Sequence, residues 1–350
     1  GSAGDFCFML VFSGQLGNEP CGVVAKLHDF SGHSRIAYRY QPGGFGKPSD
    51  IYTINPDGTD EKKITNAVPY ESFYYFPAWS PDGSMMAFGM ELCIEEEPNT
   101  NLWCEGDYSY NIAVVDLTSE FEYPYNILNI LRFACLDCVL YRHTFPAFSH
   151  DGGRIISLLA PFEKFYTPLV VMDVKSSRGR YLLDKEFWYR KNLKGAAPAW
   201  SPKEDRIAYY IHEKKDRQTH EWYLERDIYL INADGTTNTR LTNDNHWNSQ
   251  PSWSPDGDWL VFASDRDGEG FLDIWIMDKT GANRQKIYDC DPSCFSPGFS
   301  PDGLRIVFAS GGAGIYTVNL NGTDPKEVVT PGYLTEAPAW SPFLPKDEEP

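Results

Sequence analysis

The heptapeptide Pro251-Ser252-Trp253-Ser254-Pro255-Asp256-Gly257 is one copy of a motif that recurs along the chain. A proline, a small residue, an aromatic residue and a serine follow one another in the same order six times, beginning at Pro77, Pro146, Pro198, Pro251, Pro297 and Pro338. Self-similarity at a period of roughly 40 to 50 residues is typical of propeller blades or solenoid units. The motif therefore predicts a repeat architecture.

Two further signals alternate with this motif. Runs such as Ile207-Ala208-Tyr209 follow every copy except the last, and runs such as Asp227-Ile228-Tyr229 come next. Several units then close with a basic, an apolar and a threonine residue, as in Arg240-Leu241-Thr242. Because β-branched and aromatic residues are enriched in strands, each unit reads as four short strands. Six such units predict an all-β fold, a six-bladed β-propeller with four-stranded blades.

The first and last units are incomplete in complementary ways. Ile36-Ala37-Tyr38 has no motif copy before it, and Pro338-Ala339-Trp340-Ser341 has almost no chain after it. We therefore expect the C-terminal segment to supply the inner strand of a blade whose other three strands come from the N-terminal segment, which closes the ring without an open edge. The propeller is expected to span residues 32–342, between an N-terminal segment at 1–31 and an acidic tail at 343–350.

The turns of the units separate the two faces of the expected ring. Ser-Pro-Asp-Gly after the inner strand, and Asp-Gly or Asn-Gly between the third and fourth strands, are residue types that tight turns require. The connections from second to third strand, and from one unit to the next, vary widely in length. Both variable sets fall on one face, which we call the loop face, opposite the turn face. Binding residues are concentrated on such loops.

Taken together, the Pro-Ala-Trp-Ser-Pro-Asp-Gly, Ile-Ala-Phe, Asp-Ile-Tyr and Arg-Leu-Thr patterns resemble TolB-type propeller repeats, also called WD-like repeats, over about residues 32–342. The resemblance implies a six-bladed propeller. Proteins with such repeats include periplasmic translocation partners, surface proteins, peptidase accessory domains and some polysaccharide lyases. The resemblance therefore implies several functions and no single activity.

Composition restricts the partners and the compartment. The formal net charge of -18 argues against binding to nucleic acid or an anionic membrane. The apolar run from Phe6 to Phe12 is far shorter than the roughly 20 residues of a membrane helix. Eight cysteines fall into four close pairs, and such pairs predict disulfides and an extracytoplasmic location, whether secreted, cell-surface or periplasmic. The pairs are Cys7 with Cys21, Cys93 with Cys104, Cys135 with Cys138, and Cys290 with Cys294.

One loop has the composition of a calcium site. Asp265, Asp267, Glu269 and Asp273 are closely spaced carboxylates, and the intervening glycines allow a tight wrap around a hard cation such as Ca²⁺. The alternative is structural. In that case Asp-Arg-Asp-Gly is an ordinary hairpin turn, and Asp273 merely begins the third strand.

The expected loop face is rich in aromatic residues, which suit a protein interface or sugar stacking unless they fold down and pack the loops. Residues just before each inner strand are expected to surround the mouth of a central channel, among them Thr144 and Ser249. The candidate binding residues are Tyr75, Trp188, Tyr189, Trp247, Gln250 and Glu336.

Catalytic motifs are missing from the sequence. It has no Gly-x-Ser-x-Gly elbow, no complete zinc-peptidase motif and no phosphate-binding loop. We therefore expect a non-catalytic binding or self-assembly module. The alternative is a carbohydrate-active enzyme, a lyase or hydrolase, with acid and base residues among His143, His246 and Glu336.

Residues 1–31 carry a separate hypothesis. The apolar run from Phe6 to Phe12 must be covered on both faces, although the ring closes without it. It is expected either to form a disulfide-stapled hairpin or to act as an arm. An arm could add to a neighbouring subunit and build a homo-oligomer, such as a filament or surface lattice.

Overall fold

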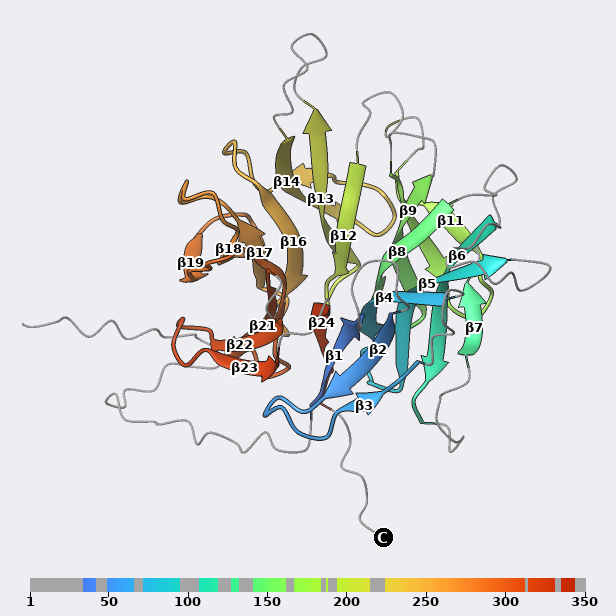
Figure 1. Cartoon of the computed structure of the whole chain (residues 1–350). Coiled ribbons are helices and arrows are strands. Elements are labelled where there is room, and N and C mark those ends of the chain that lie inside the picture. Colours follow the sequence, from blue (N-terminus) through green and yellow to red (C-terminus); the bar gives the residue numbers. More distant parts are fainter. Residues whose placement is uncertain are drawn as a thin grey trace, which may run out of the picture. The chain divides into compact units, whose positions relative to one another are not determined.

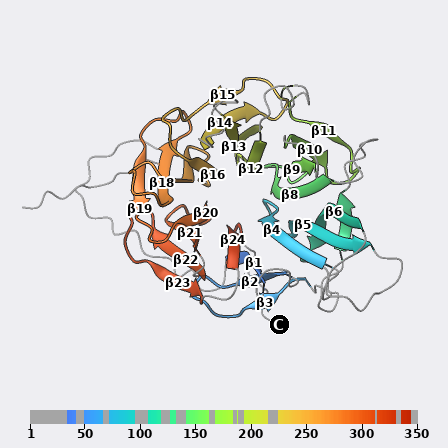
Figure 2. The same cartoon turned by 45° about the horizontal axis from the view of Figure 1, so that its top comes forward.

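The computed structural model describes residues 34–41, 49–65, 72–94, 107–118, 127–131, 141–161, 167–183, 187, 194–214, 224–311, 314–330 and 335–343. Strands β1 to β24 form six antiparallel sheets of four strands each (Figures 1 and 2). The all-β, six-bladed propeller predicted from the repeats is confirmed. Residues 1–31, including the hairpin or arm expected there, lie outside the described residues.

Each blade is numbered by its position in the ring, and its inner strand carries the Pro-x-aromatic-Ser motif. Blade 1 comprises β4 (Ser72–Trp79), β5 (Met85–Ile94), β6 (Asp107–Asp116) and β7 (Ile127–Leu131); blade 2, β8 (Tyr141–Phe148), β9 (Arg154–Pro161), β10 (Leu169–Asp173) and β11 (Gly179–Tyr181). Blade 3 comprises β12 (Lys194–Trp200), β13 (Arg206–Lys214), β14 (Leu224–Asn232) and β15 (Thr239–Arg240); blade 4, β16 (Asn248–Trp253), β17 (Trp259–Ser264), β18 (Asp273–Asp278) and β19 (Gln285–Tyr288). Blade 5 comprises β20 (Cys294–Phe299), β21 (Arg305–Ser310), β22 (Gly314–Asn319) and β23 (Lys326–Val329); blade 6, β24 (Thr335–Trp340), β1 (Ile36–Tyr40), β2 (Asp50–Ile54) and β3 (Lys62–Lys63).

Blade 6 closes the ring with strands from both ends of the described chain. In its sheet, β24 pairs antiparallel with β1, and Ile36 lies opposite Trp340. Two hydrogen bonds extend the pairing: the Ser341 backbone nitrogen donates to the Arg35 carbonyl at 2.7 Å, and the Arg35 backbone nitrogen donates to the Ser341 hydroxyl at 2.8 Å. The inner strands β4 and β24 are neighbours, as are those of every other adjacent blade pair (Figure 2). The expected closure is therefore confirmed.

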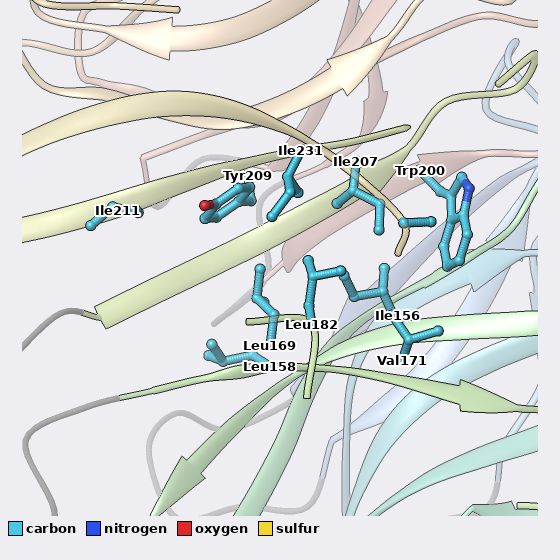
Figure 3. Close-up of a cluster of buried hydrophobic side chains, with 11 residues drawn as sticks. Ile156, Leu158, Leu169, Val171, Leu182, Trp200, Ile207, Tyr209, Ile211 and Ile231 are labelled. Atoms are coloured by element: carbon cyan, nitrogen blue, oxygen red, sulfur yellow. The ribbon is translucent and has the colours of Figure 1, made fainter. Parts of the chain in front are cut away.

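The hydrophobic core lies between blades rather than within them. Each pair of adjacent blades encloses one cluster of buried side chains among the described residues. Figure 3 shows the cluster between blades 2 and 3, where Ile156 and Val171 face Trp200 and Ile207. Ile36 and Ala37 illustrate the cause, because these consecutive residues are both fully buried, in the clusters toward blade 5 and blade 1. A strand covered on both faces must be apolar at successive positions.

The repeated motif supplies both a turn and a link between blades. In blade 4 the Ser254 hydroxyl accepts a hydrogen bond from the backbone nitrogen of Trp259 at 2.9 Å. The Asp256 carboxylate accepts one from the backbone nitrogen of Asp258 at 3.0 Å. These bonds fix the Ser-Pro-Asp-Gly turn. The aromatic residue reaches the preceding blade, where the Trp253 indole donates to the Ala199 carbonyl at 3.1 Å. The motif is therefore a structural element of the ring.

Candidate functional site: the loop face and the central cavity

The inner strand of every blade contains a bulge immediately before the motif proline. The residue at this position has a φ between 41° and 53°, in the left-handed region that non-glycine residues rarely adopt. Strand register shifts at the same place, as between Ser249 and Ser252. The six bulge residues are Phe76, Phe145, Ala197, Gln250, Ser296 and Ala337.

The bulge residues surround a central cavity of about 500 Å³ that extends toward the Ser-Pro turns. Its wall consists mainly of the motif prolines and aromatic residues, together with the bulge residues themselves. Phe76 and Phe145 stack with ring centroids 3.7 Å apart, and Gln250 exchanges two hydrogen bonds with Ser296, at 3.0 and 3.2 Å. At the channel, stacked aromatic rings therefore join blades 1 and 2, whereas hydrogen bonds between polar groups join blades 4 and 5.

The predicted channel-mouth residues take two places relative to this cavity. Gln250 lines it. Tyr75, Thr144, Ser249 and Glu336 each stand one position before a bulge residue, nearer the loop face. The bulge therefore decides which side chain of the inner strand turns into the cavity.

Tyr75 and Glu336 belong to one polar cluster at the mouth, and Arg39 joins them. The Arg39 guanidinium forms an ion pair with Glu336 at 2.8 Å, donates to Gln41 at 2.6 Å and lies 4.5 Å from the centroid of the Tyr75 ring. The Tyr75 hydroxyl donates to Glu91 at 2.8 Å. The sequence does not point to Arg39, because Arg39 and Glu336 are far apart in the chain and become neighbours only in the β1–β24 register.

A second group of predicted and unpredicted residues lies on the loop face of blades 4 and 5. Trp247, Phe271 and Phe295 are 37%, 40% and 37% exposed, and we call them the aromatic sector. The Arg226 guanidinium lies 4.2 Å from the centroid of the Trp247 ring. Trp247 was predicted; Phe271 and Phe295 were missed, although each is a large apolar residue on a variable loop or strand start.

Hydrogen bonds hold the loops of the aromatic sector together. The backbone nitrogen of Trp247 donates to the Asp265 carboxylate at 2.7 Å, which connects the entry to blade 4 with the residue that follows its second strand. The Leu272 nitrogen donates to the Ser293 hydroxyl at 2.9 Å, and the Cys294 nitrogen donates to the Leu272 carbonyl at 2.7 Å. These bonds join the loop of Phe271 to the segment that carries Phe295.

The four predicted metal ligands do not share one position. Asp267 and Asp273 lie close together, and Asp289 from the loop after β19 joins them. One carboxylate oxygen from each lies within 4.8 Å of the other two. Asp265 is bonded instead to the Trp247 backbone and lies 3.5 Å from the His246 imidazole. Glu269 is not part of the group. Burial and the neighbouring Asp267 carboxylate raise the pKa of Asp273 to about 6.

The alternative catalytic residues are divided between blades. His246 lies beside Asp265 in blade 4, whereas Glu336 is paired with Arg39 in blade 6. The backbone of His143 is in β8, but its side chain lies outside the described residues, as do Trp188 and Tyr189. The structure therefore does not bring His246 and Glu336 into one centre.

The cysteine prediction is confirmed for one pair. Cys290 and Cys294 form a disulfide that links the end of blade 4 to the inner strand of blade 5. Both sulfurs are buried in the core between these blades. The side chains of Cys7, Cys21, Cys93, Cys104, Cys135 and Cys138 lie outside the described residues. No helix in the described part of the chain is long and apolar enough to cross a membrane.

Curated relatives match this chain over short segments. An uncharacterised protein, Atu1656 of Agrobacterium fabrum, is 38% identical over 63 residues, which are 18% of this chain and 21% of that protein. The Tol-Pal system protein TolB of Rhizorhabdus wittichii is 36% identical over 62 residues, which are 17% of this chain and 14% of that protein. The chain therefore spans about a fifth or less of the length of these relatives.

Solved structures match over most of the chain. TolB from Acinetobacter baumannii has a TM-score of 0.64 at 18% identity, covering 90% of this chain and 67% of that one. An oligogalacturonate lyase in complex with manganese has a TM-score of 0.51 at 16% identity, covering 83% of this chain and 74% of that one. At these identities the likeness is one of fold.

The family model described as the TolB beta propeller domain matches residues 142–343, more than half of the 350 residues. This match covers the motif copies from Pro146 to Pro338, and the six-bladed ring agrees with it. The chain belongs to the TolB beta propeller family.

Proposed function

We propose that this chain is a non-catalytic, extracytoplasmic binding module that holds a protein partner on its loop face. The observation that carries the proposal is the aromatic sector, in which Trp247, Phe271 and Phe295 are exposed on loops and a strand start that hydrogen bonds tie together. Exposed aromatic residues on a rigid support are the usual anchors of protein interfaces. Arg226, stacked on Trp247, adds a side chain that is also enriched in such anchors.

The family and the chemistry of the chain support the rest of the proposal. Relatives of this fold include the Tol-Pal system protein TolB, and a propeller that displays variable loops is suited to recognition. A net charge of -18 favours a protein partner over nucleic acid. The buried Cys290–Cys294 disulfide favours an oxidising compartment.

The test compares two faces of the same protein. Wild type, a W247A/F271A variant and a Leu304→Ala control are used to capture partners by crosslinking in extracytoplasmic extract of the source organism. Leu304 is 47% exposed at a Ser-Pro-Asp-Gly turn, on the turn face. The captured partner is purified and its affinity measured. Losing two anchors should weaken binding at least about 30-fold, and the control should bind like wild type. A partner that binds all three equally contradicts the proposal.

A carbohydrate-active enzyme is the second candidate, and the mouth cluster is the observation that favours it. Arg39 and Tyr75 place a cation and a phenol beside Glu336, and an oligogalacturonate lyase shares the fold. Arg39 is nonetheless 8% exposed and committed to Glu336 and Gln41, which suits a structural role better. A glycan array followed by an assay for unsaturated and reducing ends decides the matter, because binding without product excludes the enzyme.

Self-assembly through residues 1–31 is a further part of the proposal. It rests on the apolar run from Phe6 to Phe12, which would be covered by a neighbouring subunit. Sedimentation of the full chain and of a chain lacking residues 1–31 provides the test. We expect the full chain to associate and the shortened chain to do so less. An intact chain that is strictly monomeric contradicts it.

A further inference from the structure

Blade 4 differs from blades 6 and 3 at the aspartate that precedes the isoleucine and the aromatic residue of the third strand. In blades 6 and 3, Asp50 and Asp227 occupy this position, and each accepts a hydrogen bond of 2.8 Å from a threonine hydroxyl, Thr65 or Thr242. Each also forms an ion pair with a basic residue of the fourth strand, Lys63 or Arg240. In these two blades the aspartate has a structural role.

The partners of the equivalent Asp273 are different. Lys286 stands opposite Trp275, as Arg240 stands opposite Tyr229, but the position two residues later is Tyr288 instead of threonine. One carboxylate oxygen of Asp273 accepts from the Cys290 nitrogen at 2.8 Å. The other, Oδ2, is buried and accepts no hydrogen bond from any residue that the structure describes, although Asp273 is only 2% exposed. A buried carboxylate oxygen without a donor is costly unless a cation is available to it.

Two additional carboxylates face this oxygen. Asp267 comes from the turn after β17 and Asp289 from the loop after β19, and the three acids offer oxygens within 4.8 Å of one another. Two oxygens that both lie about 2.4 Å from a calcium ion are at most about 4.8 Å apart. The spacing therefore fits a single hard cation.

A cationic group already stands between the three acids. The Lys286 ammonium lies 2.8 Å from Asp267, 2.8 Å from Asp289 and 3.5 Å from Asp273 Oδ2. One ammonium against three carboxylates leaves two negative charges when all three are ionised. Lys286 is 31% exposed and sits on a flexible stem, so that it can move into solvent when another cation enters.

We propose that Asp267, Asp273 and Asp289 form a divalent-cation site of the Ca²⁺ class, which Lys286 occupies in the absence of the ion and leaves on binding. The ligand set replaces the sequence-derived one, because Asp265 and Glu269 are not part of it. Three carboxylates supply only part of the six to eight oxygens that Ca²⁺ takes, and water completes the shell. Because Lys286 competes with the ion and only three carboxylates bind it, we expect a dissociation constant of about 10⁻⁴–10⁻³ M, the range of extracellular modules.

The Cys290–Cys294 disulfide helps to position two of the proposed ligands, Asp289 and Asp273. Cys290 follows Asp289 directly and its nitrogen binds Asp273, so that the Cys290–Cys294 bond fixes the loop on which the site depends. The site is independent of the proposed protein-binding function, and each can fail without the other.

The test is calorimetric titration of the full chain with CaCl₂ after removal of metal ions. Four proteins are compared: wild type, Asp289→Asn, Lys286→Gln and the control Glu269→Gln, which removes the same charge as Asp289→Asn from a neighbouring exposed residue outside the site. All three positions are exposed, so folding should be retained. Circular dichroism verifies this for each protein.

The expected results differ in sign. Asp289→Asn should weaken Ca²⁺ binding about tenfold or more, and Lys286→Gln should tighten it about tenfold, because a ligand or a competitor is lost. Glu269→Gln should stay within about twofold of wild type. The proposal is overturned if wild type and Lys286→Gln both fail to bind at about 10 mM, well above the expected range. It is also overturned if Glu269→Gln weakens binding as much as Asp289→Asn, or if Lys286→Gln binds no tighter than wild type.

Discussion

Single glycines fix how closely neighbouring blades approach at their outer turns. Gly235, Gly281 and Gly322 lie between the third and fourth strands of their blades, with positive φ angles of 91°, 85° and 79°. A Cβ added at Gly235 would lie 2.3 Å from the Leu182 carbonyl oxygen of the preceding blade, and the other two have the same relation to Leu241 and Ile287. Backbone meets backbone here, so neither side can move aside cheaply.

Alanine substitutions can distinguish the cost of a positive φ from the cost of a steric clash with the preceding blade. Gly235→Ala should cost the roughly 1–2 kcal/mol of a left-handed alanine and about 1–3 kcal/mol more for the clash. Gly268→Ala is the matched control, because Gly268 has a φ of 80° but no atom of the described part of the chain lies within 4 Å of its added Cβ. Urea unfolding of both variants gives the difference. Equal losses would show that the contact with Leu182 is unimportant.

At the scale of strands and turns, the Asp-Gly-Thr connections repeat one hydrogen-bond pattern. The Asp234 carboxylate accepts from the Thr236 nitrogen at 2.8 Å and from its hydroxyl at 2.6 Å. In blade 5 the neutral Asn321 accepts the same two bonds from Thr323, at 3.2 and 2.6 Å. The turn therefore needs an acceptor oxygen but not a charge.

These turns should contribute to the acid sensitivity of the protein. Hydrogen bonds from Thr59 and Thr236 hold the pKa of Asp57 and Asp234 below the ordinary value. The folded pKa is lower than the unfolded one, so this stability is present above about pH 4 and is lost as pH falls through the folded pKa. A D57N/D234N variant should keep the turns, as Asn321 does, and lose less stability as pH falls below about 4. Urea unfolding at several pH values measures the free energy of unfolding. If that free energy falls with pH equally in the variant and in wild type, the prediction is wrong.

The disulfide is a second element-scale device. Closing a loop of so few residues stabilises a chain by about 2 kcal/mol in the chain-entropy model. A C290A/C294A variant should lose about this much, together with order in the loop that positions Asp289. Thermal unfolding of the variant, with reduced wild type as the control, tests the expectation. Unchanged stability in both would mean that packing alone holds the segment.

At the scale of the whole ring, closure is carried by a single strand. β24 pairs with β1 and stands beside β4 and β20, so that it belongs to a blade and to both neighbouring interfaces. Without it, β1 would present an unpaired edge, and the clusters on either side would be open to water. Cooperativity of the six blades therefore depends on the C-terminal segment.

A truncation series tests this role. A chain ending at residue 330 lacks β24 and should aggregate or unfold at a melting temperature lower by about 10 °C or more, since the loss amounts to several kcal/mol. A chain ending at Phe343 keeps the strand and serves as the control. Calorimetry and size-exclusion chromatography provide the readout. A monomeric, equally stable short chain would show that the ring does not need closure.

The repeat made the fold readable because its determinants are local. Each unit carries its own strand pattern and turn residues, such as Ser254 to Gly257, and repetition of these short-range signals predicted the blades and their number. The site was less readable. Tyr75, Trp247 and Glu336 were predicted from their place on the loop face, whereas Arg39 and Asp289 become partners only when strands pair.

The sequence alone determined the six blades, the two faces and the joining of the two ends of the ring, since period, turn chemistry and incomplete terminal units are all properties of neighbouring residues. Only the tertiary structure decided which side chains meet. The bulges turn Gln250 and Phe76 into the cavity, and the register of β18 and β19 collects Asp267, Asp273 and Asp289 around Lys286. Such contacts depend on strand register and loop path, which no local pattern specifies.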